Sequence, residues 1–218
     1  MRLNYRWAAW LWAMQALTGL ALVLYIVIHT IDNATILISP KAYEDMLHLW
    51  HDLPGWFYVP MVIGLLAVLL LHMGNGIRIA SKPYKQVDFS WKHNWMLKHP
   101  GTGFWFTQVL TGSVIAVFAV WHFIIQHGAP ATMTAAQSAT RVTPTVFVMY
   151  CLFLVAVMFH AFNGLRSVLL KLGIMTDRKK ETVLIVLLAL AFVVFLLLGI
   201  ASVWQFLAPP SAFTGGLG

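Results

Sequence analysis

Gln15-Ala-Leu17-Thr18-Gly19 recurs in this chain as Gln108-Val-Leu110-Thr111-Gly112, and each stretch is followed, ten residues after its glycine, by a histidine inside an apolar segment. These two histidines are His29 and His122. An ionisable side chain within a membrane-length apolar segment is costly, so its presence at matched positions indicates a function. The chain therefore looks like two copies of one unit.

A second pair of matched stretches lies downstream. His72-Met-Gly-Asn75-Gly76-Ile-Arg78 corresponds to His160-Ala-Phe-Asn163-Gly164-Leu-Arg166. The first pair of histidines is separated by 93 residues and the second pair by 88 residues. A duplicated unit of two helices, with two histidines in each copy, accounts for both separations.

The composition is that of an integral membrane protein. Apolar residues make up 60% of the chain and charged residues 10%, which is more apolar surface than a soluble domain of this length needs. Five runs, at about 8–32, 56–80, 102–127, 145–170 and 182–206, approach or exceed the roughly 20 apolar residues that cross a bilayer. We therefore expect an all-α integral membrane protein, a single membrane domain over residues 1–218. Its five transmembrane helices form a bundle with an internal two-helix duplication.

Several other classes are excluded by the sequence. The first apolar run is too long for a signal peptide and contains one of the paired histidines. The single cysteine, Cys151, lies in the fourth run, and no Cys-x-x-Cys-His motif occurs. Covalent c-type haem attachment, iron–sulfur clusters and zinc–thiolate sites are therefore not expected on this chain.

Lysine and arginine are unevenly distributed between the two sides that five spans define. Of the 14 such residues, only Lys41 and Arg141 fall on the side that holds the loops after spans one and three. Basic residues favour the cytoplasmic side of a membrane, so the N-terminus is predicted to be cytoplasmic and the C-terminus to lie outside. The net charge of +7 thus reflects topology and lipid headgroups, not nucleic acid. The basic loop at 81–100 is a candidate docking site for a soluble partner.

The first loop on the predicted outer side alternates charged and apolar residues. It reads Lys41-Ala-Tyr43-Glu44-Asp45-Met-Leu-His48-Leu-Trp50-His51-Asp52. This pattern is typical of a short amphipathic helix that lies at the membrane surface. The following Leu-Pro54-Gly55 is expected to end that helix before the second span.

The depths of the four histidines sort them into two pairs. His29 and His122 fall near the outer ends of spans one and three. His72 and His160 fall near the inner ends of spans two and four, and at about 1.5 Å per residue the two levels lie on the order of 15 Å apart. One zinc site would need its ligands at one depth. A di-iron site would need carboxylates within the bundle, but the predicted spans contain essentially none except Asp32, at the edge of the first. Two haems, each with two axial histidines, fit this arrangement.

Residues close to the inner histidines suit the surroundings of a haem. Gly76 and Gly164 lie one turn after their histidine, where a missing side chain would let a flat macrocycle approach. Asn75 and Asn163 share that face and are candidate hydrogen-bonding groups.

Two further matched pairs are candidates for the haem environment. Arg78 and Arg166 are placed to meet haem propionates at the cytoplasmic interface. Gly19 and Gly112 lie about 15 Å inward from the outer histidines and so at the level of the inner haem, where they would give clearance. For all four glycines, close helix–helix packing is the alternative.

The five spans, the four helical histidines and the doubled His-x-x-Asn-Gly-x-Arg resemble the di-haem cytochrome b subunit of succinate:quinone oxidoreductases, in particular the menaquinol-using fumarate reductases. The resemblance covers nearly the whole chain. It implies an electron-transfer subunit of anaerobic respiration in the bacterial inner membrane. Its expected partners are an iron–sulfur subunit and an FAD-containing flavoprotein on the cytoplasmic side, and the dicarboxylate site is expected on the flavoprotein. Two b haems are implied: a proximal haem on His72 and His160, and a distal haem on His29 and His122.

The resemblance also assigns a role to the outer loop. In this family a glutamate after the first span accepts protons from menaquinol near the distal haem, and Glu44 is the best match, with Asp45 beside it. The alternative is a solvated carboxylate on an interfacial helix. Some members carry a further glutamate, two residues before the ligand on span four, that is thought to carry protons across the membrane. Met158 stands there, so we expect that path to be absent and turnover to move charge across the membrane.

Two other interpretations stay open at this point. The cytochrome b subunits of membrane-bound hydrogenases and formate dehydrogenases are similar in outline, although their histidine spacing differs. A haem-free proton-coupled transporter would also contain a repeat, although the repeat here is parallel. Both directions, fumarate reduction and succinate oxidation, are compatible with the sequence, and a dimer of heterotrimers is one arrangement of the expected complex.

Overall fold

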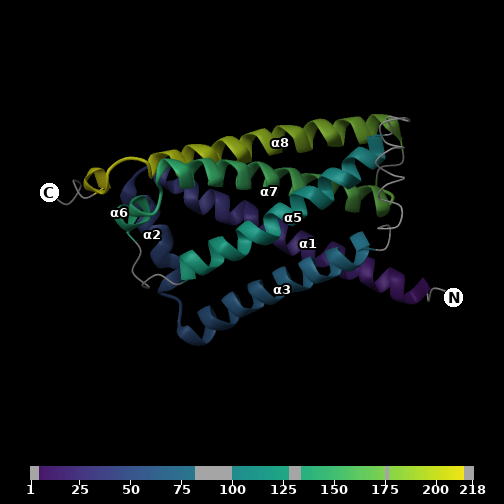
Figure 1. Cartoon of the computed structure of the whole chain (residues 1–218), viewed down its shortest axis with the longest axis horizontal. Helices are drawn as coiled ribbons and strands as arrows, with labels where there is room; N and C mark the ends of the chain where they lie inside the picture. The colour runs from purple at the N-terminus through teal and green to yellow at the C-terminus, as the bar shows by residue number, and fades with distance from the viewer. Residues whose placement is uncertain (1–4, 82–99, 128–133, 175–176, 214–218) are drawn as a thin grey trace.

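The computed structural model describes residues 5–81, 100–127, 134–174 and 177–213. Within these ranges the secondary structure is helical, and no strand occurs. The elements are α1 (Tyr5–Ala34), η1 (Thr35–Leu37), α2 (Pro40–His51), α3 (Gly55–Ser81), α5 (Pro100–His127), α6 (Ala135–Thr140), α7 (Pro144–Lys171), α8 (Arg178–Gln205) and η3 (Pro210–Phe213). Figure 1 shows the long helices running along one elongated bundle. The predicted all-α class is confirmed.

Five helices, α1, α3, α5, α7 and α8, are long and apolar enough to cross a membrane, as the sequence predicts. Their ends lie within four residues of the predicted spans. The largest difference is at α8, which begins at Arg178 instead of about residue 182. Asp177 caps this helix by accepting a hydrogen bond from the backbone N–H of Lys180 at 2.9 Å. The helix therefore starts within a basic stretch that an apolar window leaves out.

Local sequence signals fix several helix ends. The side chain of Thr143 accepts from the backbone N–H of Val146, and proline follows it at the first position of α7. The same helix ends at Lys171, and two residues later Gly173 has a φ of 70°, which glycine adopts without steric cost. The N–H of Gly173 bonds Leu170 and that of Ile174 bonds Leu169, which satisfies two terminal carbonyls.

The bundle is built from contacts of α5 with α7, α7 with α8, and α1 with α3, α7 and α8. In Figure 1 α7 and α8 run side by side, and α3 lies at the edge of the bundle. Many large apolar side chains on these helices are exposed, as expected for surfaces that face lipid. On α3 they are Trp56, Phe57, Val59, Ile63, Leu70, Leu71 and Ile77.

One end of the bundle carries a small apolar core of its own. We call this region the outer cap: the short elements η1, α2, α6 and η3, together with the C-terminal end of α8. Its buried residues are Ile36, Tyr43, Ala135, Ala139 and Phe206. Placement of this end on the outer side of the membrane stays a prediction from the charge distribution.

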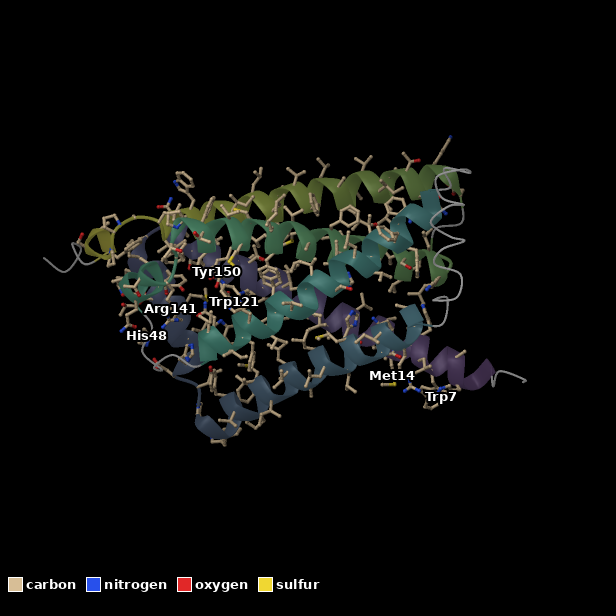
Figure 2. The ribbon with its side chains drawn as sticks, viewed as in Figure 1. Trp7, Met14, His48, Trp121, Arg141 and Tyr150 are labelled. Atoms are coloured by element: carbon tan, nitrogen blue, oxygen red, sulfur yellow. The ribbon has the colours of Figure 1, made fainter. Side chains whose placement is uncertain are left out.

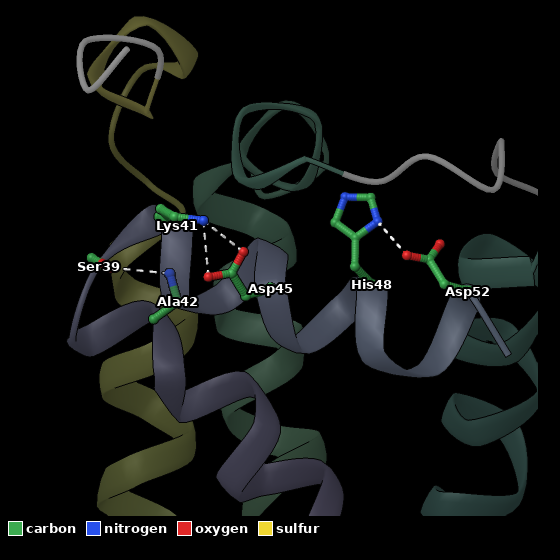
Figure 3. A network of polar contacts seen from close by, with 6 residues as sticks. All are labelled: Ser39, Lys41, Ala42, Asp45, His48 and Asp52. Atoms are coloured by element: carbon green, nitrogen blue, oxygen red, sulfur yellow. Dashed lines mark hydrogen bonds and ion pairs between the residues drawn. The ribbon is translucent and has the colours of Figure 1, made fainter. Parts of the chain in front are cut away.

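The predicted amphipathic helix after the first span is α2. Ser39 caps it, accepting from the backbone N–H of Ala42 at 3.0 Å. On its exposed face Lys41 pairs with Asp45 at 2.8 Å and His48 with Asp52 at 3.4 Å (Figure 3). The hydrogen bond that Lys41 donates to the Asp45 carboxylate raises the pKa of Lys41. The opposite face supplies Tyr43 and Leu47 to the outer cap, so α2 has the two faces that the sequence predicts.

Candidate cofactor-binding site

The four histidines meet in two pairs inside the bundle. The ring centroids of His29 on α1 and His122 on α5 lie 6.0 Å apart, with the ring planes at 76°. The ring centroids of His72 on α3 and His160 on α7 lie 6.3 Å apart, with the planes at 82°. These are the same two pairs into which the predicted depths sort the histidines.

Two glycines show that the pairs lie at different levels. A Cβ at Gly19 would lie 3.0 Å from Cε1 of His72, and a Cβ at Gly112 would lie 3.0 Å from Cε1 of His160. Gly19 and Gly112 are thus level with the inner pair, as predicted. The outer histidines follow ten residues later, about 15 Å further along the helix. The structure adds that these glycines make room for the imidazole rings themselves, whereas clearance for a macrocycle stays a prediction.

A threonine hydroxyl touches each inner histidine. Oγ1 of Thr18 lies 3.0 Å from Nδ1 of His72, and Oγ1 of Thr111 lies 3.2 Å from Nδ1 of His160. Both threonines stand in the matched stretches that begin at Gln15 and Gln108, yet the sequence analysis gives them no role. Their identical position in the two matched stretches is the signal that could have identified them.

Glutamine side chains also reach the inner histidines. Nε2 of Gln15 lies 3.2 Å from Nε2 of His72, and Nε2 of Gln108 donates to the backbone oxygen of His160 at 3.1 Å. A Cβ at Gly164 would lie 3.3 Å from the Gln108 amide. Gly76 has the same relation to Gln15, at 3.5 Å, so in this structure both glycines accommodate a glutamine.

The two asparagines bind the neighbouring helix. Nδ2 of Asn75 donates to the backbone oxygen of Leu11 at 2.6 Å, and Nδ2 of Asn163 donates to that of Phe104 at 3.2 Å. Asn163 also donates to Oε1 of Gln108 at 2.7 Å. Both asparagines therefore hold the histidine-bearing helix to its neighbour. Their predicted contact with a haem is not tested by these bonds.

The two arginines lie one to two turns beyond the inner histidines. The guanidinium of Arg78 lies 6.0 Å from the centre of the Trp7 ring, and that of Arg166 lies 4.7 Å from the centre of the Phe104 ring. Arg166 also donates to Glu181 at 2.6 Å, and this ion pair joins α7 to α8. Nε of Arg166 is buried and has no hydrogen-bond partner among the described residues.

The outer pair has different neighbours. The ring of Tyr25 stacks on His29 with the centroids 5.4 Å apart, and the hydroxyl of Tyr150 lies 3.2 Å from Nδ1 of His122. Figure 2 places Tyr150 and Trp121 near the outer end of the bundle. Neither tyrosine is predictable from the matched stretches, because Phe118 and Val62 stand at the corresponding positions.

Glu44 joins two elements of the outer cap. Its Oε1 accepts from the backbone N–H of Ala135, the first residue of α6, at 2.9 Å. The adjacent Tyr43 hydroxyl lies 3.2 Å from that of Ser138 on the same helix. Burial raises the pKa of Tyr43. Glu44 is therefore more than a solvated carboxylate, although its predicted role toward a quinol stays a prediction.

The histidine pairs fit the axial ligands of a haem. Two imidazoles can bind one metal ion from opposite sides. With bonds of about 2 Å and about 1 Å from each nitrogen to its ring centre, the two ring centres are then about 6 Å apart. Both observed separations agree with that value. Oε1 of Gln15 and Oδ1 of Asn75, both near His72, are buried and have no hydrogen-bond partner within the described part of the chain. Among the described residues, no group of three or more histidine, cysteine or acidic side chains is placed to hold a metal ion.

Comparison with known proteins identifies the family to which the chain is similar. Residues 2–81 and 89–198 match the family described as the succinate dehydrogenase/fumarate reductase transmembrane subunit. A fumarate reductase cytochrome b subunit from Helicobacter pylori is 29% identical over 168 residues, 73% of this chain. The match spans 66% of that relative's length.

Two shorter matches point the same way. A succinate dehydrogenase hydrophobic membrane anchor subunit from Archaeoglobus fulgidus is 34% identical over 98 residues, 44% of this chain and 82% of the relative. A succinate dehydrogenase 2 membrane subunit from Mycobacterium tuberculosis is 27% identical over 123 residues, 52% of this chain and 81% of the relative. Since the family match covers most of the chain, this protein belongs to the transmembrane subunits of succinate dehydrogenase and fumarate reductase.

Proposed function

We propose that this chain is the membrane anchor and electron-transfer subunit of a quinol:fumarate reductase or succinate dehydrogenase. It binds two b haems in the bacterial inner membrane and exchanges electrons with menaquinone or menaquinol near the outer histidine pair. The observation that carries the proposal is the meeting of four histidines in two pairs, 6.0 and 6.3 Å apart between ring centres. Each pair offers the two nitrogen ligands that a b-type haem takes from its protein.

The bundle supplies ligands and a dry environment at two levels of the membrane. When bound, the haems supply one-electron transfer between the two sides of the bilayer core. His29 and His122 hold the outer position, and His72 and His160 the inner one. Threonine side chains contact the inner rings and tyrosine side chains the outer ones, so the polarity differs between the two positions.

At the outer end, Glu44 is our candidate for accepting protons from a quinol. Its carboxylate lies in the outer cap on α2, and the same helix reaches the segment of the outer pair through Trp50, whose Nε1 donates to Asp32 at 3.0 Å. Asp32 is three residues after His29 on α1. Helix α2 therefore links Glu44 to the segment of α1 that carries His29.

At the inner end, Arg166 is our candidate for holding a haem propionate. Its Nη2 is bound to Glu181, but its buried Nε has no partner among the described residues, so one donor is available for an anionic oxygen. Arg78 occupies the matched position on α3. An iron–sulfur subunit and an FAD-containing flavoprotein on this side would exchange electrons with the inner position and carry the dicarboxylate chemistry.

The first experiment is a pyridine haemochrome assay with a reduced-minus-oxidised spectrum on the purified complex. We expect two b haems per chain, with loss of one haem in His29→Ala and of the other in His160→Ala. His48→Ala is the matched control, because His48 is exposed and pairs only with Asp52 in the described structure. A chain without haem would sink the electron-transfer proposal, and one haem would remove one histidine pair from it.

The proteins that co-purify with this chain distinguish the two cytochrome b interpretations. A flavoprotein with an iron–sulfur subunit is expected, whereas a metal hydrogenase would support the other cytochrome b interpretation. The family match favours the former.

A further inference from the structure

We propose that Thr18 and Thr111 are positioning residues that hold the two inner histidines in one tautomer, with the proton on Nδ1 and the lone pair of Nε2 free for iron. This inference rests on the proposed binding of an inner haem by His72 and His160. It assigns a role to two residues that otherwise read as ordinary helix threonines.

The hydroxyl of each threonine already donates a hydrogen bond to its own helix. Oγ1 of Thr18 donates to the backbone oxygen of Met14 at 2.7 Å, and Oγ1 of Thr111 donates to that of Thr107 at 2.6 Å. A hydroxyl has one proton to donate. Since each is used by the helix backbone, the hydroxyl turns its lone pairs toward the imidazole, and Nδ1 of the histidine must be the donor.

A second acceptor supports the same tautomer at His160. Its Nδ1 lies 3.1 Å from the backbone oxygen of Gln108, which can only accept a hydrogen bond. At His72 the side-chain amide of Gln15 lies 3.2 Å from Nε2, where it donates to an unprotonated nitrogen. Gln15 therefore occupies the position that a metal ion would take at Nε2 and must give it up when iron binds.

The consequence concerns both ligands of one haem. A hydrogen-bond acceptor behind a coordinating histidine fixes the ring orientation and makes the coordinating nitrogen a stronger donor. Here the acceptors stand at matched positions on α1 and α5, and Gly19 and Gly112 directly after them lie against the same rings. Each threonine–glycine pair thus fixes both the rotation and the depth of one imidazole.

A purely structural role for these hydroxyls is testable, because other hydroxyls make the same backbone bond without touching a histidine. Thr107 donates to the backbone oxygens of Gly103 and Phe104 at 2.9 and 3.0 Å. It lies on α5, one turn before Thr111. Thr107→Val therefore removes the same kind of bond from the same helix and is the matched control.

The experiment uses the whole complex with Thr18→Val, Thr111→Val, Thr107→Val and the serine variants Thr18→Ser and Thr111→Ser. The readouts are the ferric low-spin EPR signals, the midpoint potential of each haem in a redox titration, and haem content. We expect the valine variants to raise the midpoint potential and shift the EPR signal of one haem only. They should also weaken haem retention, by about 10–100-fold in affinity, as for other residues behind metal ligands. The serine variants should restore wild-type values.

The possible results separate a failure of this inference from a failure of the proposed function. Valine variants that match Thr107→Val in potential and EPR signal overturn the inference. So do serine variants that lose the inner haem as valine variants do, because the hydroxyl is then not what matters. If the wild-type complex holds two haems but the valine variants keep its midpoint potentials and EPR signals, this inference alone fails. A wild-type complex without haem instead refutes the proposed function.

Discussion

The imidazole of His72 lies against the backbone of Gly19, so close that a Cβ at position 19 would be 3.0 Å from Cε1 of the ring. Gly112 and His160 repeat the relation at the same distance. Carbon atoms pack best at about 3.5–4.0 Å, so an added methyl group must push the ring aside by a few tenths of an ångström. The depth of each inner ligand therefore depends on one glycine.

Gly19→Ala and Gly112→Ala should each weaken haem binding at the inner position and leave the outer haem in place. A displaced ligand is expected to cost about 10–100-fold in affinity. Reduced-minus-oxidised spectra at low temperature, with the two haems resolved by redox titration, measure this. Gly64→Ala is the control, since a Cβ there meets nothing within 4 Å. Full inner haem content in both alanine variants would show that the ring can yield without loss.

Tyr150→Phe should affect the outer haem alone. The variant removes the hydroxyl that lies 3.2 Å from Nδ1 of His122 but keeps the ring that packs against it. Loss of a hydrogen bond behind the ligand changes its donor strength, so the midpoint potential of the outer haem should shift. A shift of the inner haem would contradict the assignment of His122 to the outer position, and a shift of neither haem would show that the Tyr150 hydroxyl does not affect the ligand.

Much of this fold follows from the sequence, because a bilayer imposes helix length and forbids unpaired backbone. The five spans and α2 are predicted within a few residues. Pairing of His29 with His122 is predictable as well, since the chain direction of each span fixes its depth. Contacts that lie outside the repeat are not predictable, because no second copy marks them.

Glu44 and Tyr150 illustrate that limit. The contact of Glu44 with Ala135 joins residues 91 apart in the chain, and it depends on how the two outer loops fold over each other. Val62 stands at the position that corresponds to Tyr150, so no matched tyrosine marks this residue in the sequence. Thr18 and Thr111 are the opposite case: the repeat marks them, but only the geometry shows that their hydroxyls reach an imidazole.

Glu44→Gln is expected to abolish or strongly slow quinol oxidation while the outer cap stays folded. Glutamine keeps an Oε1 that can accept from the N–H of Ala135, but it cannot take up a proton at neutral pH. Quinol oxidation is measured with both haems quantified in the same preparation. Wild-type turnover in this variant would remove Glu44 from the reaction and leave it as a contact between α2 and α6.

The outer cap should lose stability in alkaline solution through Tyr43. Burial raises the pKa of this phenol in the folded protein, so its contribution is fully present below the unfolded value of about 10 and is lost as the pH rises above it. Thermal unfolding followed at pH 8 and pH 10.5 tests this. Tyr43→Phe should lose about 0.5–1.5 kcal/mol at pH 8 with the bond to Ser138, and should depend less on pH. Equal pH dependence in both proteins would exclude Tyr43 as the cause.

We predict that turnover of the complex generates a membrane potential, because Met158 stands where the resemblance implies a proton-carrying glutamate in some family members. That thioether is 1% exposed within the bundle, two residues before His160 on α7, and it has no proton to relay. If quinol releases its protons outside while electrons move inward, charge crosses the bilayer uncompensated. Complex reconstituted in sealed vesicles with a voltage-sensitive dye should show a potential that an uncoupler abolishes. Turnover without any potential would mean that other groups carry a compensating proton.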